Sequence, residues 1–270
     1  MEIMELTMLG TGFATATKCY NTCFALSNEQ GHFLVDGGGG NQILSILEEE
    51  NISLQDIHHV FVTHGHTDHL FGVLWIVRMI GARIVHGFYE GDLYVYCHKE
   101  LHETIETICN LTIWGNVTAQ FGKRIHFVEL EDGDVYEILG CRVEFFDIHS
   151  TKKKQFGFAL KTSTGGTLVC CGDEPLKEEN EKYAHGCDWL LHESFCLYEE
   201  RERFKPYEKH HSTVKDACET AEALGVKNLI LYHTEDKKLA ERKARYTQEG
   251  KQYYHGNLFV PDDRDKYQIV

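Results

Sequence analysis

The sequence lacks long hydrophobic runs and has very little proline. No apolar stretch approaches the roughly 18 residues that a membrane-spanning helix needs. The first residues include Glu2 and Glu5, with neither the basic start nor the hydrophobic segment of a secretory signal. We therefore expect a cytoplasmic protein that does not enter the membrane. Only 3 prolines and no low-complexity segment argue against long linkers, so residues 1–270 are predicted to form a single domain.

The chain also has fewer basic than acidic residues, and its cysteines form no CxxC pair. Its net charge of −15 repels nucleic-acid phosphates in general, so RNA binding would need a local basic patch. The short cationic run Lys152–Lys154 is interpreted as a solvated loop, although it could still touch a phosphate. The 10 cysteines are scattered and form no CxxC pair. We expect reduced, mostly buried thiols and no thiolate zinc site.

Metal-ligand side chains are concentrated directly after one apolar run. Val60–Val62 resembles a buried strand, and His64, His66, Asp68 and His69 follow it within a few residues. Imidazole nitrogen and carboxylate oxygen suit a borderline metal such as zinc. In a turn that leaves a strand, these side chains can point in two directions and serve two adjacent metals. The alternative is a histidine-rich surface loop.

Other polar side chains stand at the ends of apolar strand-like segments. Any one of these residues alone is weak evidence for a functional site, because a single histidine at a strand end is commonly a surface or hydrogen-bonded residue. Strand ends that meet at one edge of a packed sheet nevertheless form a rigid site. The residues in such positions, besides the group after Val62, are Asp36, His149, Asp173, His192 and His233.

Strand patterns followed by mixed helical and strand patterns occur twice, which predicts an α/β protein with two sheets packed face to face and helices outside. Residues 70–80 are apolar nearly all round and include Phe71 and Trp75, so this helix is predicted to be buried. Gly37–Gly40 predicts a close backbone approach or an unusual turn. Helical spacing predicts further helices over residues 98–109, 213–224 and 235–249.

Taken together, these motifs resemble the metallo-β-lactamase superfamily, and within it most closely the ribonuclease Z branch of phosphodiesterases. The match spans nearly the whole chain. Thr63–His69 corresponds to the superfamily motif THxHxDH. The remaining matching segments are Leu9–Gly12, Asn21-Thr22, Phe33–Gly37, His149-Ser150, Gly172-Asp173, a HEAT-like loop at Leu191–Phe195, an HST-like loop at His211–Thr213, and His233.

The resemblance implies a four-layer αββα sandwich, the metallo-β-lactamase fold, with two divalent metal ions between the sheet edges. Asp36 would orient the ligands. Zinc is the first expectation for both ions, with manganese or iron as alternatives. The implied ligands are His64, His66 and His149 for one metal, Asp68, His69 and His233 for the other, and Asp173 as the bridge.

The implied reaction is hydrolysis by a metal-bridging hydroxide. Asp68 would hold or deprotonate the attacking water, and His211, held by Glu193, would protonate the leaving group. The segment after His211 also fits a helix cap, with Thr213 and Asp216 as the capping pair, and both roles can hold together.

The chain departs from ribonuclease Z in one important respect. His149 and Asp173 are too close in sequence to enclose a long tRNA-binding arm. Together with the acidic charge, this favours a small or cyclic phosphodiester over tRNA as the substrate. The alternatives are a thioesterase or lactonase of the same fold, a tRNA 3′-processing endoribonuclease without an arm, and a noncatalytic metal-binding protein. Relatives are often dimers, so a homodimer is also expected by analogy.

Overall fold

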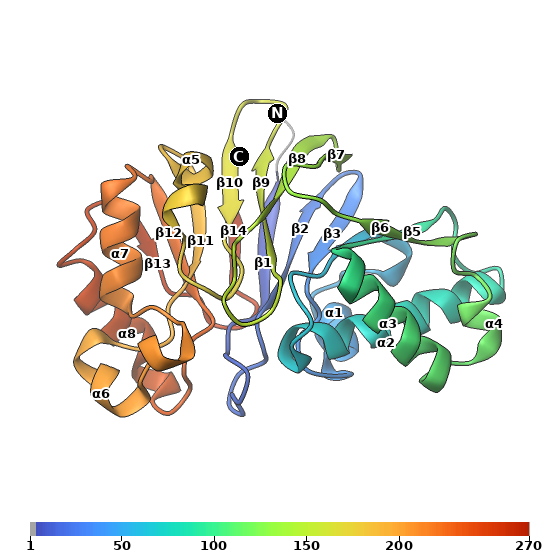
Figure 1. Ribbon diagram of the computed structural model, residues 1–270, viewed down its shortest axis with the longest axis horizontal. Helices are drawn as coiled ribbons and strands as arrows, with labels where there is room; N and C mark the ends of the chain where they lie inside the picture. Colours follow the sequence, from blue (N-terminus) through green and yellow to red (C-terminus); the bar gives the residue numbers. More distant parts are fainter. Residues whose placement is uncertain (1–3, 270) are drawn as a thin grey trace.

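Two mixed β-sheets form the centre of the protein in a computed structural model that describes residues 4–269 (Figure 1). Each sheet has seven strands. In spatial order, the first consists of β14 (Lys266–Gln268), β1 (Glu5–Gly10), β2 (Cys23–Asn28), β3 (Gly31–Val35), β4 (Ile57–Phe61), β5 (Leu93–Cys97) and β6 (Ile125–Glu129). The second consists of β13 (Asn257–Phe259), β12 (Asn228–Tyr232), β11 (Trp189–Glu193), β10 (Thr167–Cys170), β9 (Phe156–Lys161), β8 (Cys141–Asp147) and β7 (Val135–Ile138).

The helices lie outside the two sheets, as Figure 1 shows, and this arrangement confirms the predicted αββα sandwich. On the side of the first sheet are α1 (Gln42–Glu49), α2 (Thr67–Val85), α3 (Lys99–Thr112) and α4 (Gly115–Thr118). On the side of the second are α5 (Glu181–Ala184), α6 (Arg201–Phe204), α7 (Val214–Ala223) and α8 (Leu239–Gly250). Short 3-10 turns cover Leu54–Asp56, Glu178–Asn180, Tyr198–Glu200 and Tyr207–Lys209.

Parallel pairing determines where the chain can build a site. Strands β3 to β6 run parallel in the first sheet, and β10 to β13 run parallel in the second. Side chains that follow the carboxyl ends of parallel strands gather at one edge. The segments after β3, β4, β10 and β12 therefore meet in space.

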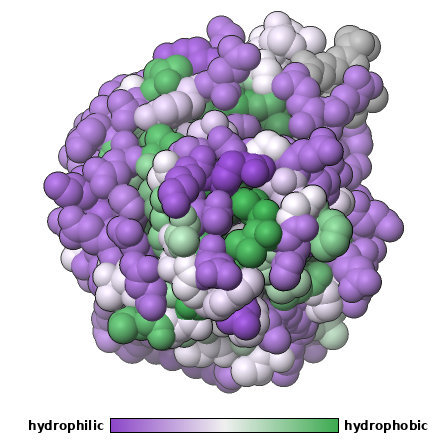
Figure 2. Space-filling model, turned by 90° about the vertical axis from the view of Figure 1, so that its right-hand side faces the viewer, coloured by the Kyte–Doolittle hydropathy of each residue, from purple (hydrophilic) through white to green (hydrophobic). Residues whose placement is uncertain are grey.

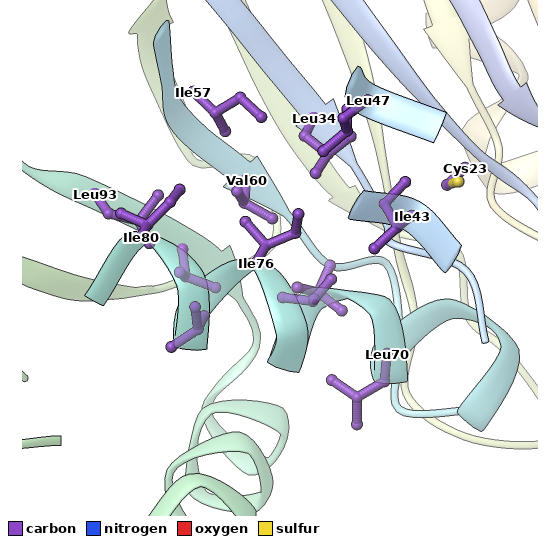
Figure 3. Close-up of a cluster of buried hydrophobic side chains, with 14 of the residues drawn as sticks. Cys23, Leu34, Ile43, Leu47, Ile57, Val60, Leu70, Ile76, Ile80 and Leu93 are labelled. Atoms are coloured by element: carbon purple, nitrogen blue, oxygen red, sulfur yellow. The ribbon is translucent and has the colours of Figure 1, made fainter. Parts of the chain in front are cut away.

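Aromatic side chains fill the space between the sheets. The ring of Phe61 lies 4.9 Å from that of Phe145 and 5.8 Å from that of Phe158, measured between centroids. A second core forms where α2 packs on the first sheet, with Ile76 and Ile80 against Val60 and other strand residues (Figure 3). These cores hold the strand ends in fixed positions.

Helix α2 confirms the helix predicted over residues 70–80, but not its complete burial. One face packs on the sheet, whereas Phe71 is 41% exposed and Trp75 is 38% exposed. The sequence is apolar on both faces, so its periodicity did not distinguish the face that meets solvent.

The last predicted helix begins later than expected, at Leu239 instead of Glu235. Residues 235 and 236 instead make loop contacts: the Glu235 amide donates to the Phe195 carbonyl at 2.8 Å. The Asp236 carboxylate accepts a hydrogen bond from the Thr17 amide at 2.6 Å. These contacts tie the loop after β1 to the second sheet.

The predicted close approach at the glycine run occurs between Gly37 and α2. The Gly37 amide donates to the His69 carbonyl at 2.9 Å, and the Gly72 amide donates to the Gly38 carbonyl at 2.8 Å. A Cβ atom on Gly37 would lie 2.3 Å from the Val73 nitrogen. The glycines let this loop lie directly on the helix that begins in the metal motif.

We predict that Gly37→Ala lowers the free energy of unfolding by about 1–3 kcal/mol, the range for overpacking a well-packed contact. Urea denaturation monitored by circular dichroism measures this change. Gly40→Ala is the matched control from the same run, because a Cβ there meets nothing within 4 Å. Equal stabilities for the two variants would contradict the contact between Gly37 and α2.

Candidate metal centre

The ends of four parallel strands bring the predicted ligands together. Asp36 follows β3, His64 lies just beyond β4, Asp173 follows β10, and His233 follows β12. Asp36 and His233 adopt left-handed backbone conformations, with φ of 58° and 57°. Such a conformation is unusual for these residue types and marks sharp turns at the edge of the site.

One group consists of Asp68, His69 and His233, whose ligand atoms all lie within 4.8 Å of one another. Asp68 and His69 belong to the first turn of α2. The Asp68 Oδ2 atom is 3.3 Å from His69 Nε2 and 3.6 Å from His233 Nε2. All three residues are buried.

The second group consists of His64, His66 and Asp173. His64 Nε2 lies 2.9 Å from His66 Nδ1 and 3.6 Å from Asp173 Oδ2. The same Asp173 oxygen is 4.0 Å from His69 Nε2 and 3.8 Å from His233 Nε2. Asp173 thus lies between the two groups, where a bridging ligand is expected.

Asp36 fixes the orientation of His69, a member of the first group, by contacting the ring nitrogen that does not face Asp68. Its Oδ2 atom lies 2.7 Å from His69 Nδ1 and accepts a hydrogen bond from the Thr63 hydroxyl at 2.8 Å. Its Oδ1 atom accepts from the Thr63 amide at 2.8 Å. A carboxylate that binds one imidazole nitrogen directs the other nitrogen toward a metal. These contacts fit the orienting role expected for Asp36.

Burial and the mixture of charges shift the protonation equilibria. Burial lowers the pKa of His64 well below its ordinary value. Burial alone would raise the pKa of Asp173, but the surrounding imidazoles, led by His64 and His233, hold it well below its ordinary value. Burial would also lower the pKa of His69, but the carboxylates of Asp68 and Asp36 raise it well above its ordinary value. The site therefore combines charged carboxylates with a neutral imidazole at His64.

The residues present fit a divalent metal ion. The buried atoms His69 Nε2 and His233 Nε2 have no hydrogen-bond partner within residues 4–269. Both atoms belong to the first group, in which every ligand atom is nitrogen or oxygen. Buried polar atoms without partners are costly, and metal coordination is one way of satisfying them.

His149 differs from the other predicted ligands. Its side chain is exposed, and it belongs to neither group. The backbone there has φ of 55°, its amide donates to Asp147 Oδ1 at 2.7 Å, and Lys177 Nζ donates to its carbonyl. The structure therefore does not bring this imidazole to Asp173, and its role as a ligand stays a prediction.

His211 lies beside the centre. It forms a third group with Asp173 and His233, and its ring centroid is 5.1 Å from that of His233. Its Nδ1 atom is 3.5 Å from Oε2 of the buried Glu193. The predicted pairing of His211 with Glu193 therefore has a geometric basis.

The loop that carries His211 is held by hydrogen bonds on both sides. The Ser212 amide donates to Glu193 Oε1 at 2.5 Å, and the Ser212 hydroxyl donates to the Glu193 carbonyl at 2.8 Å. Thr213 and Asp216 form a capping box at the start of α7, which confirms the predicted cap. Capping and placement of His211 are thus functions of one loop.

Sequence reasoning missed Gln155 and Glu174. Gln155 Nε2 donates to Asp173 Oδ1 at 2.5 Å, and its Oε1 accepts from the Asp173 amide at 2.9 Å. The buried Glu174 accepts a hydrogen bond from the Ser150 hydroxyl at 2.5 Å. No motif marks a single glutamine before a strand, so only the packed structure reveals that it orients Asp173.

His192, by contrast, is a satisfied interior histidine. Its Nε2 accepts from the Leu176 amide at 3.2 Å, and its Nδ1 lies 2.7 Å from the Glu193 carbonyl. Both nitrogens are occupied, so it is not available as a ligand.

A hollow of about 440 Å³ opens onto the centre, and it is large enough for a small organic ligand. Aromatic and cationic side chains share its wall with the metal groups. The lining includes Phe13, His66, Asp68, Lys152, Asp173, Phe195, Lys209, His211 and His233.

Residues 4–253 match the sequence family described as "Anti-Pycsar protein Apyc1". The chain belongs to the Apyc1 family. It is 29% identical to ribonuclease Z of Methanothermobacter thermautotrophicus, over 86% of each chain. Among solved structures, the metallo-β-lactamase fold protein YhfI of Bacillus subtilis superposes with a TM-score of 0.81 at 16% identity, over 98% of this chain and 99% of that one. The short form of human tRNase Z (ELAC1) gives a TM-score of 0.74 at 20% identity, over 98% and 99% of the respective chains.

These similarities agree with the site. This Apyc1-family protein is a metal-dependent hydrolase with the metallo-β-lactamase fold, related to the ribonuclease Z branch. Residues 149–173 form a short loop and the β9–β10 hairpin, with no long arm.

Within residues 4–269, no helix combines the length and apolar character that crossing a membrane requires. Nine of the 10 cysteines are buried, as expected.

We predict that Asp36→Asn weakens zinc binding about 10- to 100-fold, the usual effect of losing a carboxylate behind a ligand histidine. Competition with a chromogenic chelator measures the affinity. Asp188→Asn is the control, because Asp188 binds Thr167 and Lys227 far from the site. Unchanged affinity in Asp36→Asn would show that its contact with His69 does not support metal binding.

Proposed function

We propose that this Apyc1-family protein hydrolyses phosphodiesters with two bound divalent ions, zinc being the first expectation and manganese or iron the alternatives. The observation that carries the proposal is the position of His211 beside Asp173 and His233, with Glu193 behind it. A metal centre with an adjacent proton donor suits a reaction whose leaving group is a poor one.

When bound, the ions would supply Lewis acidity, which lowers the pKa of a coordinated water to give a bridging hydroxide and offsets charge on the phosphoryl group. The proposed ligands are the two groups around Asp173, together with His149. Asp68 faces the same space and is proposed to orient the attacking water, because its carboxylate is held charged by neighbouring imidazoles. Gln155 donates a hydrogen bond to Asp173 Oδ1 and so would hold this carboxylate between the two groups, where it is proposed to bridge the ions.

His211 is proposed to protonate the departing alkoxide. Glu193 lies at the Nδ1 side of the ring, which leaves Nε2 as the nitrogen that can serve the substrate. The Ser212 amide binds the other Glu193 oxygen, so the carboxylate has a fixed direction. Both side chains are almost fully buried, and at 3.5 Å the two atoms form no hydrogen bond, so the proposed pairing is an ion pair that requires a protonated imidazole.

A small or cyclic phosphodiester is the proposed substrate. The hollow of about 440 Å³ has the size of a small-ligand site. The net charge of −15 and the short β9–β10 connection both disfavour a folded tRNA.

Two other activities remain as candidates. The similarity to ribonuclease Z favours an RNase without an arm as the second candidate, and a thioesterase or lactonase would use the same metals without needing His211. A reducing, cytoplasmic setting is proposed as well, in line with ten scattered cysteines that form no CxxC pair.

We also propose a homodimer formed through the outer face of α2 and α3. Figure 2 shows that the side of the molecule on the right of Figure 1 is mainly hydrophilic, with small groups of hydrophobic side chains among the polar ones. A groove of about 450 Å³ lies there, lined by Phe71, Trp75 and Ile108. Arg78, which is exposed on α2, also lines this groove.

We predict that His211→Ala lowers kcat for the dinucleotide UpU by about 10²- to 10⁴-fold, the usual range for general acid catalysis. Hydrolysis of bis(p-nitrophenyl) phosphate should fall much less, because p-nitrophenolate departs without protonation. Steady-state kinetics on both substrates measures the difference.

The control for this experiment is His255→Ala, an exposed histidine paired with Glu222 at a distance from the site. Equal losses on the two substrates would contradict proton donation by His211. Hydrolysis of a thioester panel, with no diester turnover, would favour the thioesterase.

We predict that Trp75→Glu converts a dimer to a monomer, because a buried charge at the centre of an interface costs several kcal/mol. Light scattering after size-exclusion chromatography measures the mass. Val135→Glu, on an exposed edge strand elsewhere, should leave the mass unchanged. A wild-type protein that is monomeric at high concentration would exclude this dimer.

A further inference from the structure

A second hollow meets the metal centre at Lys152. It has a volume of about 360 Å³ and lies between the loop after β8 and the first turns of α3. Lys152 lines this hollow and also the one over the metal groups. We call the second hollow the lysine pocket, which is lined by Gly65, His98, Glu100, Leu101, Thr104, Lys152, Lys153 and Lys154.

The loop that carries the lysines is held in place by buried groups. Ser150 Oγ donates to the buried Glu174 and accepts hydrogen bonds from the Lys152 and Lys153 amides at 3.1 and 3.3 Å. At the other end, the Lys154 ammonium lies 5.4 Å from the centroid of the Phe156 ring. Lys153 and Lys154 are exposed, as expected of a solvated loop, and these contacts fix the backbone of the run beside the site.

The charge of the lysine pocket is opposite to that of the protein. Its lining holds three ammonium groups and one carboxylate, Glu100, in a chain whose net charge is −15. Lys152 faces Asp173 Oδ2 at 3.8 Å and Glu174 Oε1 at 3.9 Å. Among residues 4–269, Lys153 and Lys154 have no carboxylate partner within 4.0 Å. Two ammonium groups without an ion-pair partner beside a catalytic centre favour an anionic ligand.

We propose that the lysine pocket binds a second phosphate group of the same substrate. The inference rests on the proposed function and narrows it. The substrate class is a phosphodiester with another phosphate one nucleotide away, as in a short linear or cyclic oligonucleotide. While the scissile phosphate lies at the metal groups, Lys152 stands between the two phosphates, and Lys153 and Lys154 bind the outer one.

The first experiment compares kcat/KM for UpU, pUpU and UpUp, since the extra phosphate can stand on either side of the diester. The wild-type protein should prefer one phosphorylated dinucleotide to UpU by about tenfold, the effect of one charge-assisted hydrogen bond. The double variant K153M/K154M should reduce this preference to near one. K161M removes a lysine that lines a separate hollow, between β7, β8 and β9, and should retain the preference.

Two outcomes of this experiment overturn the proposal. One is a wild-type protein with no preference, or a preference that survives in K153M/K154M. The other is stimulation of UpU cleavage by inorganic phosphate that K153M/K154M abolishes, which would make the pocket a regulatory site for free phosphate.

A binding measurement separates this proposal from the proposed function. If no dinucleotide is cleaved, the phosphodiesterase proposal fails, but the pocket is still tested by calorimetry on the zinc-loaded protein. Uridine 3′,5′-bisphosphate should bind about tenfold more tightly than either uridine monophosphate. That advantage should disappear in K153M/K154M and remain in K161M. Equal affinities of the wild-type protein for all three nucleotides would contradict a second phosphate site.

Discussion

The architecture of the site depends on the negative charge of two carboxylates, Asp68 and Asp173, that are held out of water. Burial makes such charges costly unless cations or hydrogen-bond donors lie close to them. Asp173 is surrounded by imidazoles and receives a hydrogen bond from Gln155, while the Lys152 ammonium approaches its other oxygen. The same need for positive charge explains the raised pKa of His69. A divalent ion in this place would replace protons as the counter-charge, which couples metal uptake to proton release.

The sheets supply the rigidity that these interactions require. The proposed ligands come from distant parts of the sequence, but each follows a strand whose neighbours fix it on both sides. Asp36 and Gln155 then set the directions of His69 and Asp173 through short hydrogen bonds. Because Asp36 and Gln155 hold His69 and Asp173 in place, these two side chains would lose little conformational entropy on binding a metal.

Much of this site could be predicted from the sequence, because its signals are local. The spacing from His64 to His69 after an apolar run reveals a ligand loop, and the order of Asp173 and His233 completes the pattern. His149 is exposed because its backbone makes a left-handed turn, and no residue in the sequence predicts that turn. The role of Gln155 and the exposed face of α2 depend on which distant segments pack together. Long-range contacts of this kind leave no periodic trace in one sequence.

The pairing of β1 with β14 has a consequence for how the protein is made. The two strands are distant in sequence, yet they form one edge of the first sheet. During synthesis, β1 therefore has one edge unpaired until residues 266–268 have been made. Open strand edges invite pairing with other chains, so nascent molecules are vulnerable to aggregation until β14 is in place. Loss of residues 266–268 would leave that edge of β1 open permanently.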